Sequence, residues 1–203
     1  MNKIGYNEVT NLEEIVFNKK ENTLYNYIFR NDNIINLNSI TFDDCEFHNC
    51  KIEGNIDYCT FTNCLFDKCD LSNCMLKESG LHYLTIKDSK ILGLSIIDSL
   101  IKNSILKDNL ANLINFSNTT LNSVDIINNN MENSSFVTVK FKNINLLENN
   151  MNDNEFIDTS LNNIDLSSNN INNIKINIEN IKGAIIDQIQ VYDLINLLNI
   201  KIK

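Results

Sequence analysis

An apolar residue recurs at every fifth position over most of this chain. From Phe61 to Ile186 the spacing is unbroken and gives 26 consecutive apolar residues at that period. Because 43% of all residues are apolar, chance would produce such a run about 3 times in 10 billion. A period of five fits neither the 3.6-residue repeat of a helix nor the two-residue alternation of a strand. The chain is therefore expected to turn a corner every five residues.

Like residues also recur every twenty positions, which is four repeats. Phenylalanine occupies positions 116, 136 and 156, and asparagine occupies positions 109, 129, 149 and 169. Four repeats per turn predict an all-β solenoid whose turns stack as parallel strands about 4.8 Å apart. Asparagine amides stacked in this way can bond to the amides above and below them. We predict a solenoid over residues 35–186, with an N-terminal cap over 1–34 and a capping segment over 187–203.

The upstream part of the repeat contains one irregular step. Leu37, Phe42, Phe47 and Ile52 keep the period of five, but Ile56 follows Ile52 after only four residues. The regular spacing resumes at once. We interpret the missing residue as a local adjustment within a single turn.

The composition indicates how the corners are built. The chain has 40 asparagines, five glycines and no proline, so asparagine and aspartate are expected at the turns. Gly93 is expected at a tight corner.

With only two histidines and no glycine-rich loop, we find no catalytic constellation. We expect no enzyme, no cofactor and no metal site.

Cysteine and histidine positions within the repeat indicate packing and surface. Every cysteine lies two positions before an apolar centre, where the repeat places a small inward residue: Cys45, Cys50, Cys59, Cys64, Cys69 and Cys74. Buried free cysteine packs as a small hydrophobe, and the CxxC pairs preferred by zinc are absent. His48 and His82 follow their centres by one position, so we expect them to be solvated.

No targeting signal is visible at the start of the sequence. Residues 1–10 carry no basic stretch followed by an apolar run, so we expect no signal peptide. No apolar segment is long enough to span a membrane. We therefore expect a cytoplasmic protein with reduced cysteines.

The net charge of -9 is unevenly distributed along the chain. Residues 39–75 carry seven acids and two lysines, residues 76–119 four acids and five lysines, and residues 120–180 eight acids and three lysines. Two lines of acids are predicted at the position two residues after the centre. Glu78, Asp98 and Asp158 are expected to share one face, and Asp88, Asp108 and Glu148 to share the next. An ordinary solvated surface is the simpler interpretation, because lysines lie beside these acids.

The repeats resemble those of the pentapeptide repeat proteins. Cys45-Glu46-Phe47-His48-Asn49-Cys50 and Cys59-Thr60-Phe61-Thr62-Asn63-Cys64-Leu65-Phe66 are similar to that family's repeats, and the likeness covers about three quarters of the chain. The resemblance implies a right-handed quadrilateral β-helix.

The C-terminal residues resemble the tail of the quinolone-resistance type of that family. Ile181-Lys182-Gly183-Ala184-Ile185-Ile186 is followed by Gln190 and an apolar pattern. Asp187 and Gln190 have the spacing of a capping box. A helix and short strand that only cover the last turn would explain this segment. The resemblance implies that they also form a homodimer, through Val191, Leu194, Ile195, Leu198, Ile200 and Ile202.

The quinolone-resistance type mimics DNA and binds DNA gyrase and topoisomerase IV. The resemblance implies a type II topoisomerase as partner, resistance to fluoroquinolones or another gyrase poison, and no direct nucleic-acid binding. The acidic surface expected to meet the partner contains Asp125, Glu132, Glu148, Asp153, Asp158 and Asp165. The repeat lacks the projecting loops of many such proteins. The alternative is a structural or scaffold module that binds an unrelated cytoplasmic protein.

Overall fold

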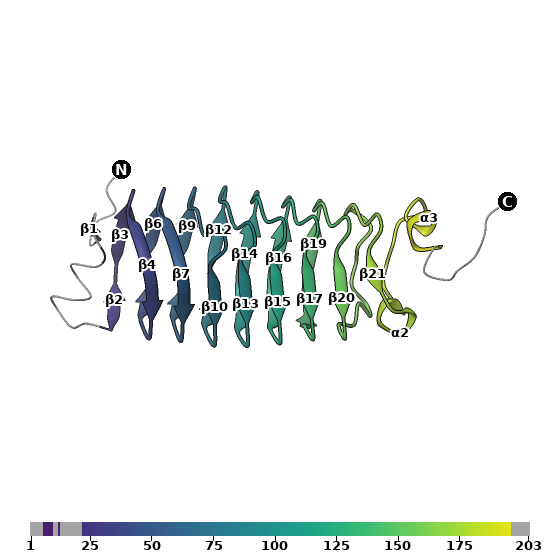
Figure 1. Ribbon diagram of the computed structural model, residues 1–203, viewed down its shortest axis with the longest axis horizontal. Coiled ribbons are helices and arrows are strands. Elements are labelled where there is room, and N and C mark those ends of the chain that lie inside the picture. The colour runs from purple at the N-terminus through teal and green to yellow at the C-terminus, as the bar shows by residue number, and fades with distance from the viewer. Residues whose placement is uncertain (1–5, 10–11, 13–21, 196–203) are drawn as a thin grey trace.

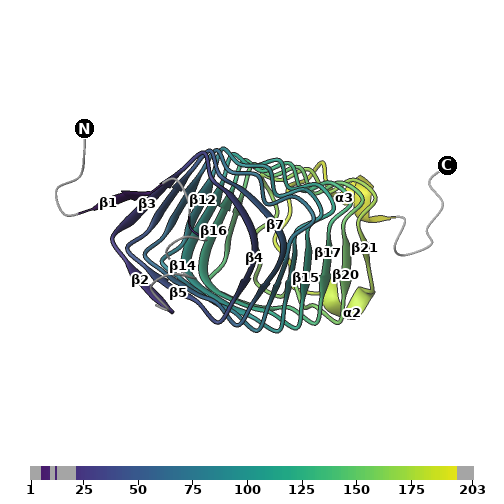
Figure 2. The ribbon, with the colours of Figure 1, turned by 60° about the vertical axis from the view of Figure 1, so that its left-hand side comes forward.

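The chain forms one elongated β-solenoid. The computed structural model describes residues 6–9, 12 and 22–195. About eight turns of parallel strands stack along the long axis, and two short helices follow at the C-terminal end (Figure 1). In an oblique view, successive turns follow nearly the same outline (Figure 2). The predicted right-handed quadrilateral β-helix is confirmed.

The four sides of each turn are named faces 1 to 4 after their buried centres in one turn, Phe61, Phe66, Leu71 and Leu76. Each corner residue, two positions after a centre, is assigned to the face that it follows. Face 1 contains β2 (Thr23–Tyr25), β5 (Thr41–Asp43), β8 (Thr60–Thr62), β11 (Gly80–His82), the first parts of β14 (Leu100–Lys107) and β16 (Thr120–Ile127), and β18 (Lys140–Lys142). Face 2 contains β1 (Asn7–Val9), β3 (Tyr27–Arg30), β6 (Glu46–His48), β9 (Leu65–Asp67), β12 (Thr85–Lys87), the second parts of β14 and β16, and β19 (Asn145–Leu147).

Face 4 forms the second sheet, whereas face 3 is held mainly by single bridges such as that between Asn130 and Asn150. The strands of face 4 are β10 (Met75–Lys77), β13 (Ser95–Ile97), β15 (Asn115–Ser117), β17 (Ser135–Val137), β20 (Glu155–Ile157) and β21 (Lys175–Ile176). Two longer strands, β4 (Asn33–Asn38) and β7 (Lys51–Asp57), run from face 3 onto face 4.

Turn length is constant after the first two turns. On face 1, Phe61, Leu81, Ile101 and Leu121 pair in parallel at a separation of twenty. The earlier turns are shorter, because on the same face Thr23 pairs with Thr41 and Thr41 pairs with Thr60. On this face the twenty-residue turns thus begin at Thr60. A register shift between β4 and β7 accompanies the short step after Ile52.

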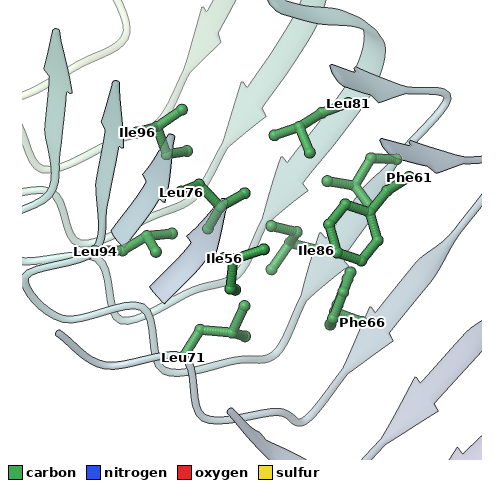
Figure 3. Close-up of a pocket in the computed structure, with 10 residues that line it drawn as sticks. Ile56, Phe61, Phe66, Leu71, Leu76, Leu81, Ile86, Leu94 and Ile96 are labelled. Atoms are coloured by element: carbon green, nitrogen blue, oxygen red, sulfur yellow. The ribbon is translucent and has the colours of Figure 1, made fainter. Parts of the chain in front are cut away.

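The interior is filled by the centre residues and by the residues two positions before them. Phenylalanines stack between turns, with ring centroids 5.3 Å apart for Phe116 and Phe136 and 4.9 Å apart for Phe136 and Phe156. In the turns that contain Phe61 and Leu81, core side chains from all four faces point toward one another (Figure 3). They leave an apolar space of only about 10 Å³. A void this small and apolar is expected to be dry.

The asparagine column is a buried ladder, as the spacing predicted. Asn109, Asn129, Asn149 and Asn169 are at most 4% exposed. Each Nδ2 donates to the Oδ1 of the next asparagine, at 2.9, 3.1 and 3.0 Å. The same Oδ1 atoms accept the backbone N–H groups of the preceding asparagines. Because each amide is paired across turns, the column is polar without leaving these groups unsatisfied.

Corners are built with positive φ angles, mostly by asparagine and aspartate. Among the described residues, 28 non-glycine positions have positive φ, and thirteen asparagines and six aspartates make up 19 of them. These residues tolerate the left-handed region better than other side chains. Gly93 has φ +63° at a corner, and a Cβ there would lie 2.7 Å from the Asn73 Oδ1. The expectation of asparagine-built corners and of a tight corner at Gly93 is confirmed.

The C-terminal end is closed by two short helices, α2 (Ile178–Ile181) and α3 (Val191–Leu194). The Asp187 backbone N–H donates to the Gln190 Oε1 at 2.8 Å, and the Asp187 carboxylate accepts the Ile189 N–H. The Gln190 Nε2 donates to the carbonyl oxygens of Leu166 and Asn169 at 2.9 and 2.6 Å. A glutamine side chain therefore ends the inward ladder.

Candidate functional site

From residue 108 onward, the charged outward residues of faces 2 and 3 in the described chain are all acidic. We call this surface the acidic side and define it by Asp108, Asp125, Glu132, Glu148, Asp153 and Asp165. Over residues 108–187, no lysine or arginine of the described chain occupies an outward position on either face. The surface therefore presents one sign of charge along the rod, except at its start, where the Nζ of Lys107 on face 2 lies 3.8 Å from the Asp108 Oδ2.

The stacking brings five of the six predicted partner-binding acids onto this side. Asp125 pairs with Asn145 on face 2, and Asp165 lies one turn further in the same column. Glu148 lies at the corner after face 2, and Glu132 and Asp153 lie on face 3. Asp158, the sixth, is separated from them because it lies at the corner after face 4.

One predicted arrangement of acids is wrong. The line of Glu78, Asp98 and Asp158 and the line of Asp88, Asp108 and Glu148 were expected on adjacent faces. They lie at the corners after faces 4 and 2, which are diagonally opposite, because ten residues correspond to two corners of the coil. Asp108 was missing from the predicted partner-binding set. Its separation of forty residues, or two turns, from Glu148 could have identified it.

A shallow groove of about 390 Å³ runs along the edge between faces 2 and 3. Its lining includes the acidic corner residues Asp108 and Glu148 and the exposed Leu110. On its walls, the Asn128 Nδ2 donates to the Asp108 Oδ1 at 2.6 Å, and the neighbouring Asn150 amide donates to Asn130. An open groove of carboxylates and amides suits an extended surface contact better than an enclosed small molecule.

Hydrogen bonds stabilise the ionised form of one predicted partner-binding carboxylate. The Ser167 hydroxyl and backbone N–H donate to the Asp165 Oδ1 at 2.6 and 2.9 Å. These two bonds lower the pKa of Asp165. Asp165 is therefore a carboxylate at neutral pH and below.

The expectation that His48 is a solvated surface residue is wrong. The His48 Nε2 lies 3.0 Å from the Glu46 Oε2, and its Nδ1 lies 3.4 Å from the Asp67 Oδ2. Only 16% of the His48 side chain is exposed. Glu46 is two residues away on the same strand, and Asp67 is one turn along the rod, so stacking encloses the ring between two carboxylates. His82 is also half-buried.

The six cysteines are free thiols in the core, at most 2% exposed. Burial raises the pKa of Cys74 to about 11. A hydrogen bond to Cys45 and burial raise the pKa of Cys64, and Cys50 and burial do the same for Cys69. Thiols buried without access to solvent are poor nucleophiles and metal ligands. In the described part of the chain, no group of three or more His, Cys, Asp or Glu is arranged to hold a metal ion.

The predicted dimer residues lie at the C-terminal end. Val191 is exposed, and Leu194 and Ile195 are half-buried. Leu198, Ile200 and Ile202 lie outside the described residues. Nearby, Ile185, Ile189 and Tyr192 are more than half exposed.

None of the described helices is long and apolar enough to cross a membrane.

Comparison with known proteins identifies the fold. Residues 59–136 match the model of the pentapeptide repeat region. Two trypsin-treated variants of QnrB1, a plasmid-mediated fluoroquinolone resistance protein, are similar in structure. The first has a TM-score of 0.59 at 17% identity, covering 89% of this chain and 98% of the other. The second has a TM-score of 0.54 at 14% identity, covering 89% and 100%.

HetL is a pentapeptide repeat protein from the cyanobacterium Nostoc that is involved in heterocyst differentiation regulation. It matches with a TM-score of 0.29 at 9% identity, and the match covers 87% of this chain and 93% of HetL. No curated protein sequence gives a significant match.

Proposed function

We propose that this pentapeptide-repeat β-helix is a non-enzymatic protein that mimics DNA and binds a type II topoisomerase, DNA gyrase or topoisomerase IV. The observation that supports the proposal most is the acidic side, where faces 2 and 3 carry carboxylates and, between residues 108 and 187 of the described chain, no lysine or arginine. The fold, shared with a fluoroquinolone resistance protein, supports the same partner class.

The density of charge is comparable with that of DNA. The six residues of the acidic side, from Asp108 to Asp165, span about 14 Å of rod at the spacing of parallel strands. That is about one charge per 2.3 Å, against about one per 1.7 Å of duplex DNA. A groove that binds DNA is lined by positive charge and attracts either rod. The enzyme surface that fits the acidic side is thus its DNA-binding groove.

A supercoiling assay tests whether gyrase is the partner and whether the protein protects or inhibits it. The chain is added to gyrase and relaxed plasmid with and without a fluoroquinolone, and direct binding is measured in parallel. Restored supercoiling in the presence of the drug would establish protection, and suppressed supercoiling without drug would establish inhibition. Both require binding. No binding and no effect on either reaction would rule out the topoisomerase, and capture of another cytoplasmic protein would then favour the scaffold alternative.

Charge reversal tests the acidic side itself. Changing Asp125, Glu148 and Asp165 together to lysine should weaken gyrase binding at least tenfold, because three attractions become repulsions. The matched control changes Glu78, Asp98 and Asp158, at the corner after face 4, to lysine. It alters net charge equally and should leave affinity within about threefold. Equal losses in both variants would mean that net charge, and not this surface, governs binding.

We also propose a homodimer through the segment 187–203. The exposed apolar side chains at this end, Ile185, Ile189 and Tyr192, support an interface there, since covering them with a second copy would remove apolar surface from water. Light scattering should give twice the chain mass for the full protein and the chain mass after removal of residues 196–203. A full-length monomer would contradict the dimer without affecting the topoisomerase proposal.

A further inference from the structure

The C-terminal half of face 1 is a basic surface on an acidic protein. Lys102, Lys140 and Lys142 lie at its outward positions, and Lys182 follows α2 in the last turn. We call these four residues the lysine strip. All four are exposed. Between residues 60 and 187, fourteen of the fifteen acids lie on faces 2, 3 and 4. The fifteenth, the exposed Glu179 of α2, lies three residues before Lys182 at the end of face 1.

The strip is ordered by the stacking of the turns. Lys102, Asn122 and Lys142 occupy one column, and Leu100, Thr120 and Lys140 occupy the column beside it. Lys102 and Lys142 are therefore two turns apart, about 9.6 Å along the rod. The surface between them is a parallel sheet that ends at β18, and Ser160 and Asn162 follow in the next turn outside any strand.

The strip lysines are not engaged by acids of the rod. The described lysine ion pairs join Lys51, Lys77, Lys87 and Lys107 to nearby carboxylates, and these four lysines lie on faces 2, 3 and 4. No ion pair of the described chain involves a strip lysine. Their ammonium groups remain available for an external anion.

We propose that the lysine strip binds the phosphate backbone of duplex nucleic acid. Lysine, serine, threonine and asparagine are among the side chains that contact phosphate and sugar in such complexes, and the strip and its neighbours consist mainly of these types. A straight, rigid row of cations fits a rigid linear polyanion. The aromatic residue between Lys140 and Lys142, Phe141, packs against the core. No ring of the strip is therefore turned outward for a base to stack on, and binding is independent of sequence. This differs from the expectation that the chain does not bind nucleic acid directly.

Nearby carboxylates limit the affinity. Asp98 and Asp158 border face 1 at the corner after face 4, and Asp125 and Asp165 lie on face 2. The net charge of -9 also repels a polyanion at long range. Binding is therefore weak and strongly dependent on salt. Four phosphate contacts give a slope of log K against log salt of about -3.6.

Fluorescence anisotropy with a labelled duplex of mixed sequence, titrated at several salt concentrations without any enzyme, tests the proposal. Changing Lys102, Lys140 and Lys142 together to glutamine should reduce the slope to about -0.9, since three contacts are lost. The control changes Lys77, Lys87 and Lys107 to glutamine and removes the same charge from faces 2 and 4. It should retain the original slope. Circular dichroism of each variant checks that the solenoid is intact.

Three results would overturn the proposal. These are an absence of binding at low salt, an equal loss in both triple variants, and competition by polyglutamate as effective as by unlabelled duplex. The last would assign the strip to an acidic protein. Because no topoisomerase is present, failure here is distinguishable from failure of the proposed function.

Discussion

At the scale of single residues, asparagine has two distinct structural roles. At corners it adopts positive φ, as in Asn118 and Asn133. In the interior it bonds to copies of itself in the turns above and below, as in Asn129. The first role depends on local backbone preference, and the second depends on stacking. The large asparagine content thus contributes both to the turns and to the polar part of the core.

Interrupting the ladder should destabilise the protein far more than changing a corner. We expect Asn129→Leu to lower the free energy of unfolding by about 2 to 4 kcal/mol, because the Asn109 backbone N–H and the Leu106 carbonyl lose their partners in the core. Urea denaturation measures this. The control, Asn118→Asp at an exposed corner, should stay within about 0.5 kcal/mol. Equal effects would contradict a structural role for the ladder.

Removing the hydroxyl of Ser167 should raise the pKa of Asp165. Ser167→Ala deletes the shorter of the two bonds to the Asp165 carboxylate, and carboxyl NMR titration reads the shift directly. Since the pKa of Asp165 is lowered in the folded state, its ionised carboxylate stabilises the fold at pH values above the ordinary aspartate pKa of about 4. That contribution is lost as the pH falls through the lowered pKa. Ser168→Ala, which removes no bond to Asp165, should leave its titration unchanged.

At the scale of elements, register is decided by how many residues each turn contains. Strands of three residues, such as β8 and β11, are too short to be stable alone and are held by the turns on either side. The sequence predicted the regular turns because the period of five is uninterrupted there. It did not predict the first turn, in β2 and β3, because the shorter spacing between paired strands at this end interrupts the period.

The end of the ladder should depend on Gln190. In Gln190→Ala the carbonyl oxygens of Leu166 and Asn169 lose their donor, so the last turn should open more easily. We expect amide hydrogen exchange over residues 161–176 to accelerate about tenfold, with earlier turns unaffected. Gln188→Ala, an exposed neighbour, is the control. Unchanged exchange in Gln190→Ala would show that α3 covers the end without this side chain.

At the scale of the whole molecule, twenty residues per turn decide both shape and charge distribution. The lysine strip and the acidic side alternate along the sequence, yet they lie on different sides of the rod. Lys140 and Lys142 lie on face 1, whereas Asp125 and Asp165 lie on face 2. The separation arises because each face receives only every fourth repeat. Two partners of opposite charge can therefore contact one rod on different sides.

Deleting one whole turn should preserve the fold. Removal of residues 100–119 joins Ser99 to Thr120 and keeps every later column in place. We expect cooperative thermal unfolding and a rod shorter by about 4.8 Å in small-angle scattering, with unchanged cross-section. Removing only residues 103–119 keeps residues 100–102, so one turn is three residues longer than its neighbours. This smaller deletion should melt at a lower temperature, because the extra residues lack stacking partners; the reverse order would contradict the twenty-residue turn.

The sequence alone determined the architecture, because inward positions obey a strict local rule. Every fifth residue is apolar, and residues twenty apart are alike, which was enough to predict the solenoid, the asparagine ladder and the buried cysteines. The tertiary structure alone decided which outward residues become neighbours. The enclosure of His48 between Glu46 and Asp67 and the closure by Gln190 depend on contacts between turns. The diagonal placement of the two acidic lines already follows from five residues per face and twenty per turn. Outward positions carry no periodic constraint, so their neighbours follow only from the length of each turn.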